Sequence, residues 1–242
     1  MGRDDTGHYA APMLDGGPPW LERTLQVLDL RRRDRLLLVQ PGGVALAVAV
    51  AGVVGDRGEI TVLEPRRRAA EAIAKALPRA AVLAYEPSAE EHFGVFDAVL
   101  ALPLAEPPLP IEVWASLTAT NLRPGGRFVV DLPGSDPFPD ARLAAIDANL
   151  PCAARFAIEL AGPNEADLVQ ALIARGLRRV EPLLGTHLVR FGSPFDLAEL
   201  VGRALRLDED EQLALGEAIA RRTQSTSTIE TLAQRTAIAG MR

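Results

Sequence analysis

The chain has 242 residues, 48% of them hydrophobic, and a formal net charge of −6. That is enough apolar material for one substantial core, and the negative charge argues against a general nucleic-acid binder, which carries a basic face. Its only cysteine, Cys152, excludes an internal disulfide and any metal site built from several cysteines. No apolar run reaches the roughly 20 residues of a membrane helix, and residues 1–17 lack a signal-peptide pattern, so we expect a cytoplasmic protein without a membrane segment.

The chain begins with a segment that has no apolar periodicity. Residues 1–19 are rich in Gly, Pro and Asp and are expected to form a mobile lead-in. From Trp20 to Leu30 apolar residues recur at helical spacing, which predicts an amphipathic helix. Several arginines crowd the end of this helix, namely Arg31, Arg32, Arg33 and Arg35. Cations are favoured at the negative end of a helix dipole, and we interpret the run in that way rather than as an anion site.

The stretch from Arg35 to Glu64 organises the rest of the chain. Its parts are, in order, a buried strand (Leu36–Val39), a glycine turn (Pro41–Gly43), a helix (Val44–Val54) and a second buried strand (Ile60–Leu63). This is the plan of a nucleotide-binding βαβ unit, in which the turn admits a ligand and an acid such as Glu64 accepts from ribose hydroxyls. Any doubly wound protein also needs such a unit for its core, so the pattern predicts the fold more firmly than the ligand.

After Glu64 the pattern alternates between helices and strands. We expect a helix from about Pro65, strands at Ala80–Ala84 and Phe96–Ala101, a helix at Ile111–Asn121, a strand at Arg127–Leu132, a helix at Glu165–Arg175, and strands at Arg178–Leu184 and Thr186–Phe191. The last two strands are separated only by Gly185, which predicts a hairpin with Thr186–Phe191 antiparallel near an edge. Residues 133–163 form a predicted cap insertion in a domain spanning 20–193, followed by helices at 194–223 and a polar tail at 224–242.

Several segments together resemble the class I S-adenosylmethionine-dependent methyltransferases. The βαβ unit ends on Glu64, Phe96–Leu100 resembles the strand before the family's catalytic loop, and Leu122–Phe128 resembles its L-x-P-G-G-x-hydrophobic turn. The resemblance covers about Trp20 to Thr223. It implies a Rossmann-like α/β fold: a doubly wound, mostly parallel, seven-stranded sheet with a closing antiparallel hairpin, and with Leu36–Val39 at its centre.

The same resemblance implies where S-adenosylmethionine would bind. Gln40, Gly42 and Gly43 form the first loop, Glu64 would hold the ribose hydroxyls, and Glu86 would lie near the adenine, with Glu90 as a rival. The family's loop reads acid-x-Gly-x-Gly-x-Gly, whereas here the matching positions run from Leu38 to Val44 and keep only Gly42 in register. The missing acid and glycines predict weak binding of this cofactor.

No catalytic residue can be assigned from the sequence. The segment Ala101–Leu104 lacks the Asn/Asp-Pro-Pro-aromatic motif of amino-group methylases, which argues against amino methylation. The candidates for a general base or nucleophile are His8, His92, His187 and Cys152, and each is better explained as an ordinary surface or packed residue.

Two functions therefore remain open. The first is methyl transfer from S-adenosylmethionine to a small-molecule acceptor, with the loop Leu102–Pro108 and the 133–163 cap shaping the acceptor site. The alternative is a non-catalytic protein of the same fold that acts as a subunit, scaffold or ligand sensor, with a protein partner or in a homo-oligomer. A dinucleotide-dependent oxidoreductase is disfavoured because Gln40–Ala45 does not supply Gly-x-Gly-x-x-Gly.

Overall fold

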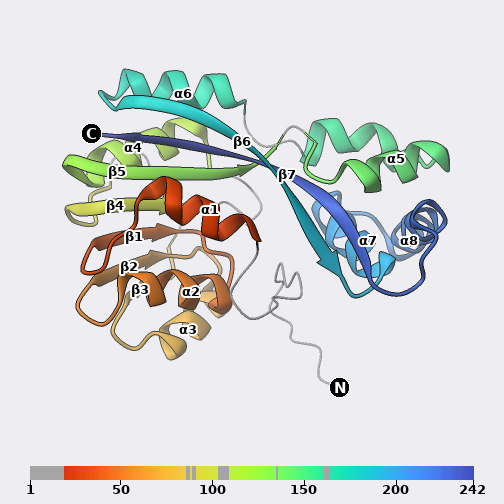
Figure 1. Ribbon diagram of the computed structural model, residues 1–242, viewed down its shortest axis with the longest axis horizontal. Helices are drawn as coiled ribbons and strands as arrows, with labels where there is room; N and C mark the ends of the chain where they lie inside the picture. Colours follow the sequence, from red (N-terminus) through yellow and green to blue (C-terminus); the bar gives the residue numbers. More distant parts are fainter. Residues whose placement is uncertain (1–18, 86–87, 89–90, 103–108, 135, 161–163) are drawn as a thin grey trace.

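The computed structural model describes residues 19–85, 88, 91–102, 109–134, 136–160 and 164–242, so all but the last residue of the predicted lead-in lies outside the described residues. They form a seven-stranded sheet with helices on both faces and further helices at one end (Figure 1). The helices are α1 (Pro19–Leu28), α2 (Val44–Val54), α3 (Arg67–Ala76), α4 (Ile111–Asn121), α5 (Pro139–Asp147), α6 (Glu165–Ala174), α7 (Pro194–Ala204) and α8 (Glu209–Thr223). The strands are β1 (Arg35–Val39), β2 (Glu59–Leu63), β3 (Ala81–Leu83), β4 (Phe96–Ala101), β5 (Leu122–Pro133), β6 (Arg178–Phe191) and β7 (Ile229–Met241).

The strand order is β3-β2-β1-β4-β5-β7-β6, and the first five strands of this order are parallel. β1 lies inside the sheet between β2 and β4, as predicted. Its unbroken apolar sequence is explained by burial on both faces. Leu37 and Val39 pack into the core that α4 and α6 cover, whereas Leu36 and Leu38 pack into the core under α1 and α2.

The predicted closing hairpin is antiparallel, but its members are different. Arg178–Phe191 is one continuous edge strand, β6, and the prediction of two strands joined at Gly185 is wrong. β6 pairs antiparallel with β7, and β7 pairs antiparallel with β5, so β6 runs in the same direction as the parallel strands. Gly185 has a packing role in mid-strand: a Cβ atom there would lie 2.7 Å from side-chain nitrogens of Arg23 and His187.

The predicted polar tail is also wrong, because residues 229–241 form β7 between β5 and β6. Its residues alternate between buried and exposed positions at the start of the strand, as a strand with one covered face requires. The buried positions, however, include Thr231 and Arg235 as well as Ile229 and Ala233. Polar residues on the covered face hide the alternation from an analysis based on hydrophobicity.

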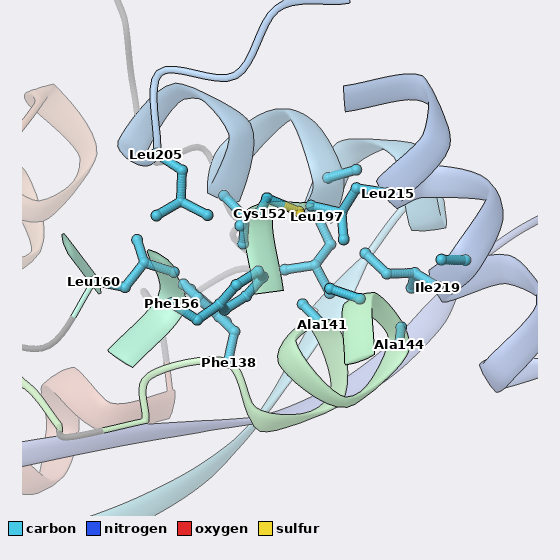
Figure 2. Close-up of a cluster of buried hydrophobic side chains, with 14 of the residues drawn as sticks. Phe138, Ala141, Ala144, Cys152, Phe156, Leu160, Leu197, Leu205, Leu215 and Ile219 are labelled. Atoms are coloured by element: carbon cyan, nitrogen blue, oxygen red, sulfur yellow. The ribbon is translucent and has the colours of Figure 1, made fainter. Parts of the chain in front are cut away.

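The predicted cap insertion and the C-terminal helices share a single core. Beyond the pair Pro133–Arg235, β6 and β7 continue as a two-stranded ribbon to the pair Phe191–Ile229, and α5, α7 and α8 gather at its end (Figure 1). Side chains from these helices and from the short helices at 151–160 interdigitate there (Figure 2). Cys152 lies inside this core, and burial raises the pKa of its thiol, so its environment suits packing rather than nucleophilic chemistry. No helix of the described part is long and apolar enough to cross a membrane.

Candidate nucleoside site at the carboxyl edge

The first loop and the tip of β2 meet at the carboxyl edge of the sheet, where α/β proteins of this type bind nucleotides. The backbone N–H of Gln40 donates to the carbonyl of Leu63 (2.7 Å), and that of Gly42 donates to Oε2 of Glu64 (3.1 Å). Gln40, Gly42, Gly43 and Glu64 therefore lie together, as the sequence predicts. Glu86 and its rival Glu90 lie outside the described residues.

The first loop has a shape of its own. Gln40 (φ 51°) and Gly42 (φ 77°) adopt left-handed conformations, and Gly43 is extended before α2 begins at Val44. Glycine tolerates the left-handed region, whereas a residue with a Cβ loses about 1–3 kcal/mol there. Val44 avoids that cost because the helix has already started. The loop thus places its strain on Gln40, at the point where the family pattern has glycine.

Glu64 is held by the protein itself. Its side chain is completely buried, and Arg66, two residues further on, wraps back over it. The Arg66 Nε donates to Oε1 (2.8 Å), Nη2 lies 3.4 Å from Oε2, and the Arg66 backbone N–H also donates to Oε1 (3.2 Å). The same Nη2 donates to the carbonyl of Gly42 at 2.6 Å. Arg66 therefore ties the acid at the strand tip to the glycine loop.

This arrangement determines what Glu64 can do. A carboxylate has about four acceptor positions, and here they face backbone and guanidinium N–H groups. Ribose hydroxyls would have to displace the guanidinium before Glu64 could accept from them. The contact between Arg66 and Glu64 was not predicted from the sequence, since a side chain that bonds a residue two positions away leaves no periodic pattern.

Two neighbouring side chains test whether the site fits S-adenosylmethionine. Leu38, at the position of the family's acid, is fully buried in the core under α1 and α2 and offers no partner to an ammonium group. Gln40 is 1% exposed, and its Oε1 atom has no hydrogen-bond partner in the described part of the chain. Because Glu64 is bound by Arg66 and Leu38 is apolar, the described residues do not fit S-adenosylmethionine in this conformation.

The candidate catalytic groups are not gathered around Glu64. His8 lies outside the described residues, and His92 is exposed shortly before β4. His187 pairs with Ala233 on the β6–β7 ribbon, and three strands of the sheet separate β6 from β1, which leads into the first loop. Burial lowers the pKa of His187; Arg23 and Arg235 lower it further, against the opposing effect of Asp131.

Within the described residues no group of three or more His, Cys, Asp or Glu side chains is placed to hold a metal ion. Of the predicted acceptor loop, residues 103–108 lie outside the described part.

Neither a scan against protein-family models nor a comparison with curated sequences finds a match. Solved structures do match. A Bacillus halodurans protein provisionally assigned as a methyltransferase superposes with a TM-score of 0.58 at 12% identity, covering 91% of this chain and 97% of its own. Mycolic acid cyclopropane synthase CmaA1, solved with S-adenosylhomocysteine, gives 0.56 at 13% identity over 92% of this chain and 83% of its own. A SAM-dependent O-methyltransferase from Thermotoga maritima gives 0.51 at 14% identity over 93% and 66%.

These likenesses and the strand order define the class. The chain has the class I S-adenosylmethionine-dependent methyltransferase fold, with the seven-stranded mixed sheet that the sequence predicts. At 12–14% identity the likeness extends to the fold alone.

Proposed function

We propose that this protein is a non-catalytic protein of the methyltransferase fold, acting as a subunit or ligand-responsive partner, with its nucleoside site closed by Arg66. One observation carries the proposal: the buried carboxylate of Glu64 is bound by the guanidinium of Arg66, which also binds the Gly42 carbonyl. The acid that would define a ribose site is instead a structural partner of its own loop.

The free energies of the polar contacts favour a nucleoside site closed by Arg66 over one that binds the cofactor. If ribose bound, Glu64 would exchange its bonds from the Arg66 guanidinium for bonds from the ribose hydroxyls. Little net free energy would therefore be gained at Glu64. Leu38 leaves the cofactor's ammonium group without a carboxylate, and a missing polar contact costs about 1–3 kcal/mol. Because 1.4 kcal/mol is a factor of ten in Kd, these two deficits move a micromolar site toward the millimolar range.

One observation favours the second function, methyl transfer to a small-molecule acceptor. The buried Oε1 of Gln40 has no partner in the described part of the chain, and an ammonium or hydroxyl group of a ligand in the first loop would satisfy it. Arg66 is 33% exposed, so its side chain has room to swing away from Glu64. In that case Arg66 covers a site that binds the cofactor once the side chain has moved.

Calorimetric titration with S-adenosylmethionine and S-adenosylhomocysteine separates the two functions. The unmodified protein should bind neither ligand more tightly than about the millimolar range. The variant Arg66→Gln frees Glu64 and should bind about tenfold more tightly, as expected for one recovered polar contact. The matched control is Arg67→Gln, since Arg67 is 86% exposed and, among the described residues, forms an ion pair with Glu71 alone.

Micromolar binding by the unmodified protein would refute closure and favour the enzyme. Equal, weak binding by the unmodified protein and by Arg66→Gln would refute the role given to Arg66 and assign the loss to the first loop. A gain in both Arg66→Gln and Arg67→Gln would point to a general charge effect, which also contradicts the proposal.

A further inference from the structure

A cavity lies at the opposite edge of the sheet from Glu64. It has a volume of about 830 Å³ and is formed at the amino edge, where the loops leading into β1, β2 and β3 meet the ends of α2 and α3. Ligand sites commonly have volumes of about 300–1,000 Å³. The cavity is far along the strands from the first loop, so its occupancy does not depend on the function proposed above.

The apolar side chains that line the cavity are aliphatic. The larger ones are Val48, Val54, Ile60 and Leu77, and none of the described residues in the lining is aromatic. Val48 is 43% exposed although it is a large apolar residue on a core helix. Next to it on α2, a Cβ atom added to Gly52 would meet no atom within 4 Å, so the helix surface here is open. The absence of aromatic side chains from the lining disfavours a ligand that stacks, such as a nucleobase.

The charged side chains that line the cavity are mostly cationic. Among the described residues they are Arg32, Arg33, Arg57 and Arg79, with Asp56 as the one acid, 3.7 Å from Arg79. Among the described residues, Arg32, Arg33 and Arg57 form no ion pair with an acid. This local excess of positive charge stands out in a chain whose net charge is −6. Arginine is suited to carboxylates and phosphates because its planar fork binds them through two parallel N–H groups.

The helix-dipole interpretation of the arginine run accounts for only part of it. α1 ends at Leu28, and the dipole acts on cations within the last turn. Arg31 pairs with Asp29 and Arg35 with Glu59, so these two arginines have local partners. Arg32 and Arg33 lie beyond the reach of that dipole and border the cavity instead. The carbonyl ends of α2 and α3 also attract cations to this edge, but four arginines exceed what two partial charges require.

We propose that this cavity binds a small amphipathic anion with an aliphatic body and a carboxylate or phosphate head. The body packs against Val48, Val54, Ile60 and Leu77, and the head lies between the arginines of the lining. Burial of the ligand's aliphatic body supplies most of the affinity, and the arginines select the charged head group.

Calorimetry with the full chain and four probes tests this proposal. Decanoate and decyl phosphate carry the two kinds of head group, decan-1-ol carries the same body without charge, and inorganic phosphate carries charge without a body. The decyl anions should bind in the micromolar range, below their micelle-forming concentrations, and at least tenfold more tightly than decan-1-ol. Whichever of the two anions binds more tightly identifies the head group. Inorganic phosphate alone should bind at least a hundredfold more weakly.

Three variants locate the site. Gly52→Leu fills the cavity with a better helix former, so it should abolish binding of the decyl anions while the melting temperature stays the same or rises. The double variant Arg32→Gln/Arg57→Gln should weaken anion binding at least tenfold and leave decan-1-ol unchanged. Arg190→Gln, an exposed arginine on β6, is the control that should change nothing. Absence of binding by both anions, equal binding of decan-1-ol, or undiminished binding by Gly52→Leu would overturn the proposal.

Discussion

Replacing Arg66 by glutamine tests the contact on which the closed nucleoside site depends. In the unmodified protein Glu64 is fully buried and Arg66 is 33% exposed. The substitution removes the bond from Nε to Oε1 (2.8 Å) and the bond from Nη2 to the Gly42 carbonyl (2.6 Å). The backbone N–H groups of Gly42 and residue 66 remain on the carboxylate.

The size of the effect follows from these contacts. Removing one partner of a buried ion pair costs about 3–5 kcal/mol, whereas an exposed pair is worth about 0–1 kcal/mol. This pair is intermediate, because one partner is buried, the other reaches solvent, and two backbone donors stay in place. We therefore expect the free energy of unfolding to fall by about 1–3 kcal/mol in Arg66→Gln.

Urea denaturation followed by tryptophan fluorescence measures this change, since Trp20 and Trp114 are both buried. The control Arg67→Gln loses only a surface pair within α3 and should change the free energy of unfolding by less than about 0.5 kcal/mol. A double-mutant cycle with Glu64→Gln isolates the interaction and should give a coupling of about 1–2 kcal/mol. If Arg66→Gln is as stable as Arg67→Gln and the cycle shows no coupling, the contact has no energetic role and the reasoning fails.

Two further predictions concern Arg235 and His187, which lie on the β6–β7 pair. Arg235 is bound to Asp131 (2.6 Å) and lies over the ring of Trp20, so Arg235→Met should lower the free energy of unfolding by about 3–5 kcal/mol in urea denaturation, while the exposed Arg190→Met should cost less than about 0.5 kcal/mol. Burial holds the pKa of His187 below its usual 6.5, so the folded state favours the neutral ring, and the resulting stability is present above about pH 6.5 and is lost as pH falls below it. The drop in the free energy of unfolding between pH 7 and pH 5 should therefore be smaller in His187→Gln; an equal drop would contradict the assignment.

The parallel half of the sheet could be predicted from the sequence because its strands are buried on both faces. Burial on both faces forces a continuous apolar run, as in β1, and such a run is visible without any partner. Once β1 and β2 are recognised, the order of the chain identifies the glycine turn that follows β1 and the acid that follows β2. In the structure Gly42 and Glu64 meet at the carboxyl edge, where the Gly42 N–H donates to the Glu64 carboxylate.

The antiparallel half could not be predicted in the same way. β7 carries Thr231 and Arg235 on its covered face, where Asp140 and Asp131 satisfy them, so its buried positions do not look apolar. Gly185 resembles a turn in the sequence, yet it serves close packing against Arg23 in the middle of β6. Both errors have one origin: the partners that make a polar or small residue suitable for a strand come from distant parts of the chain.

The case of Glu64 shows how a retained motif residue can mislead. A carboxylate at the tip of β2 is the feature of this sequence that matches a nucleoside site best, and it is also fully buried. A buried carboxylate without partners would be strongly unfavourable, and here Arg66 and the Gly42 N–H satisfy it. Glu64 therefore has a structural role that needs no cofactor, so its presence alone does not distinguish an enzyme from a non-catalytic relative. The variant Arg66→Gln addresses that distinction, because a ligand and the guanidinium would compete for the same oxygen atoms.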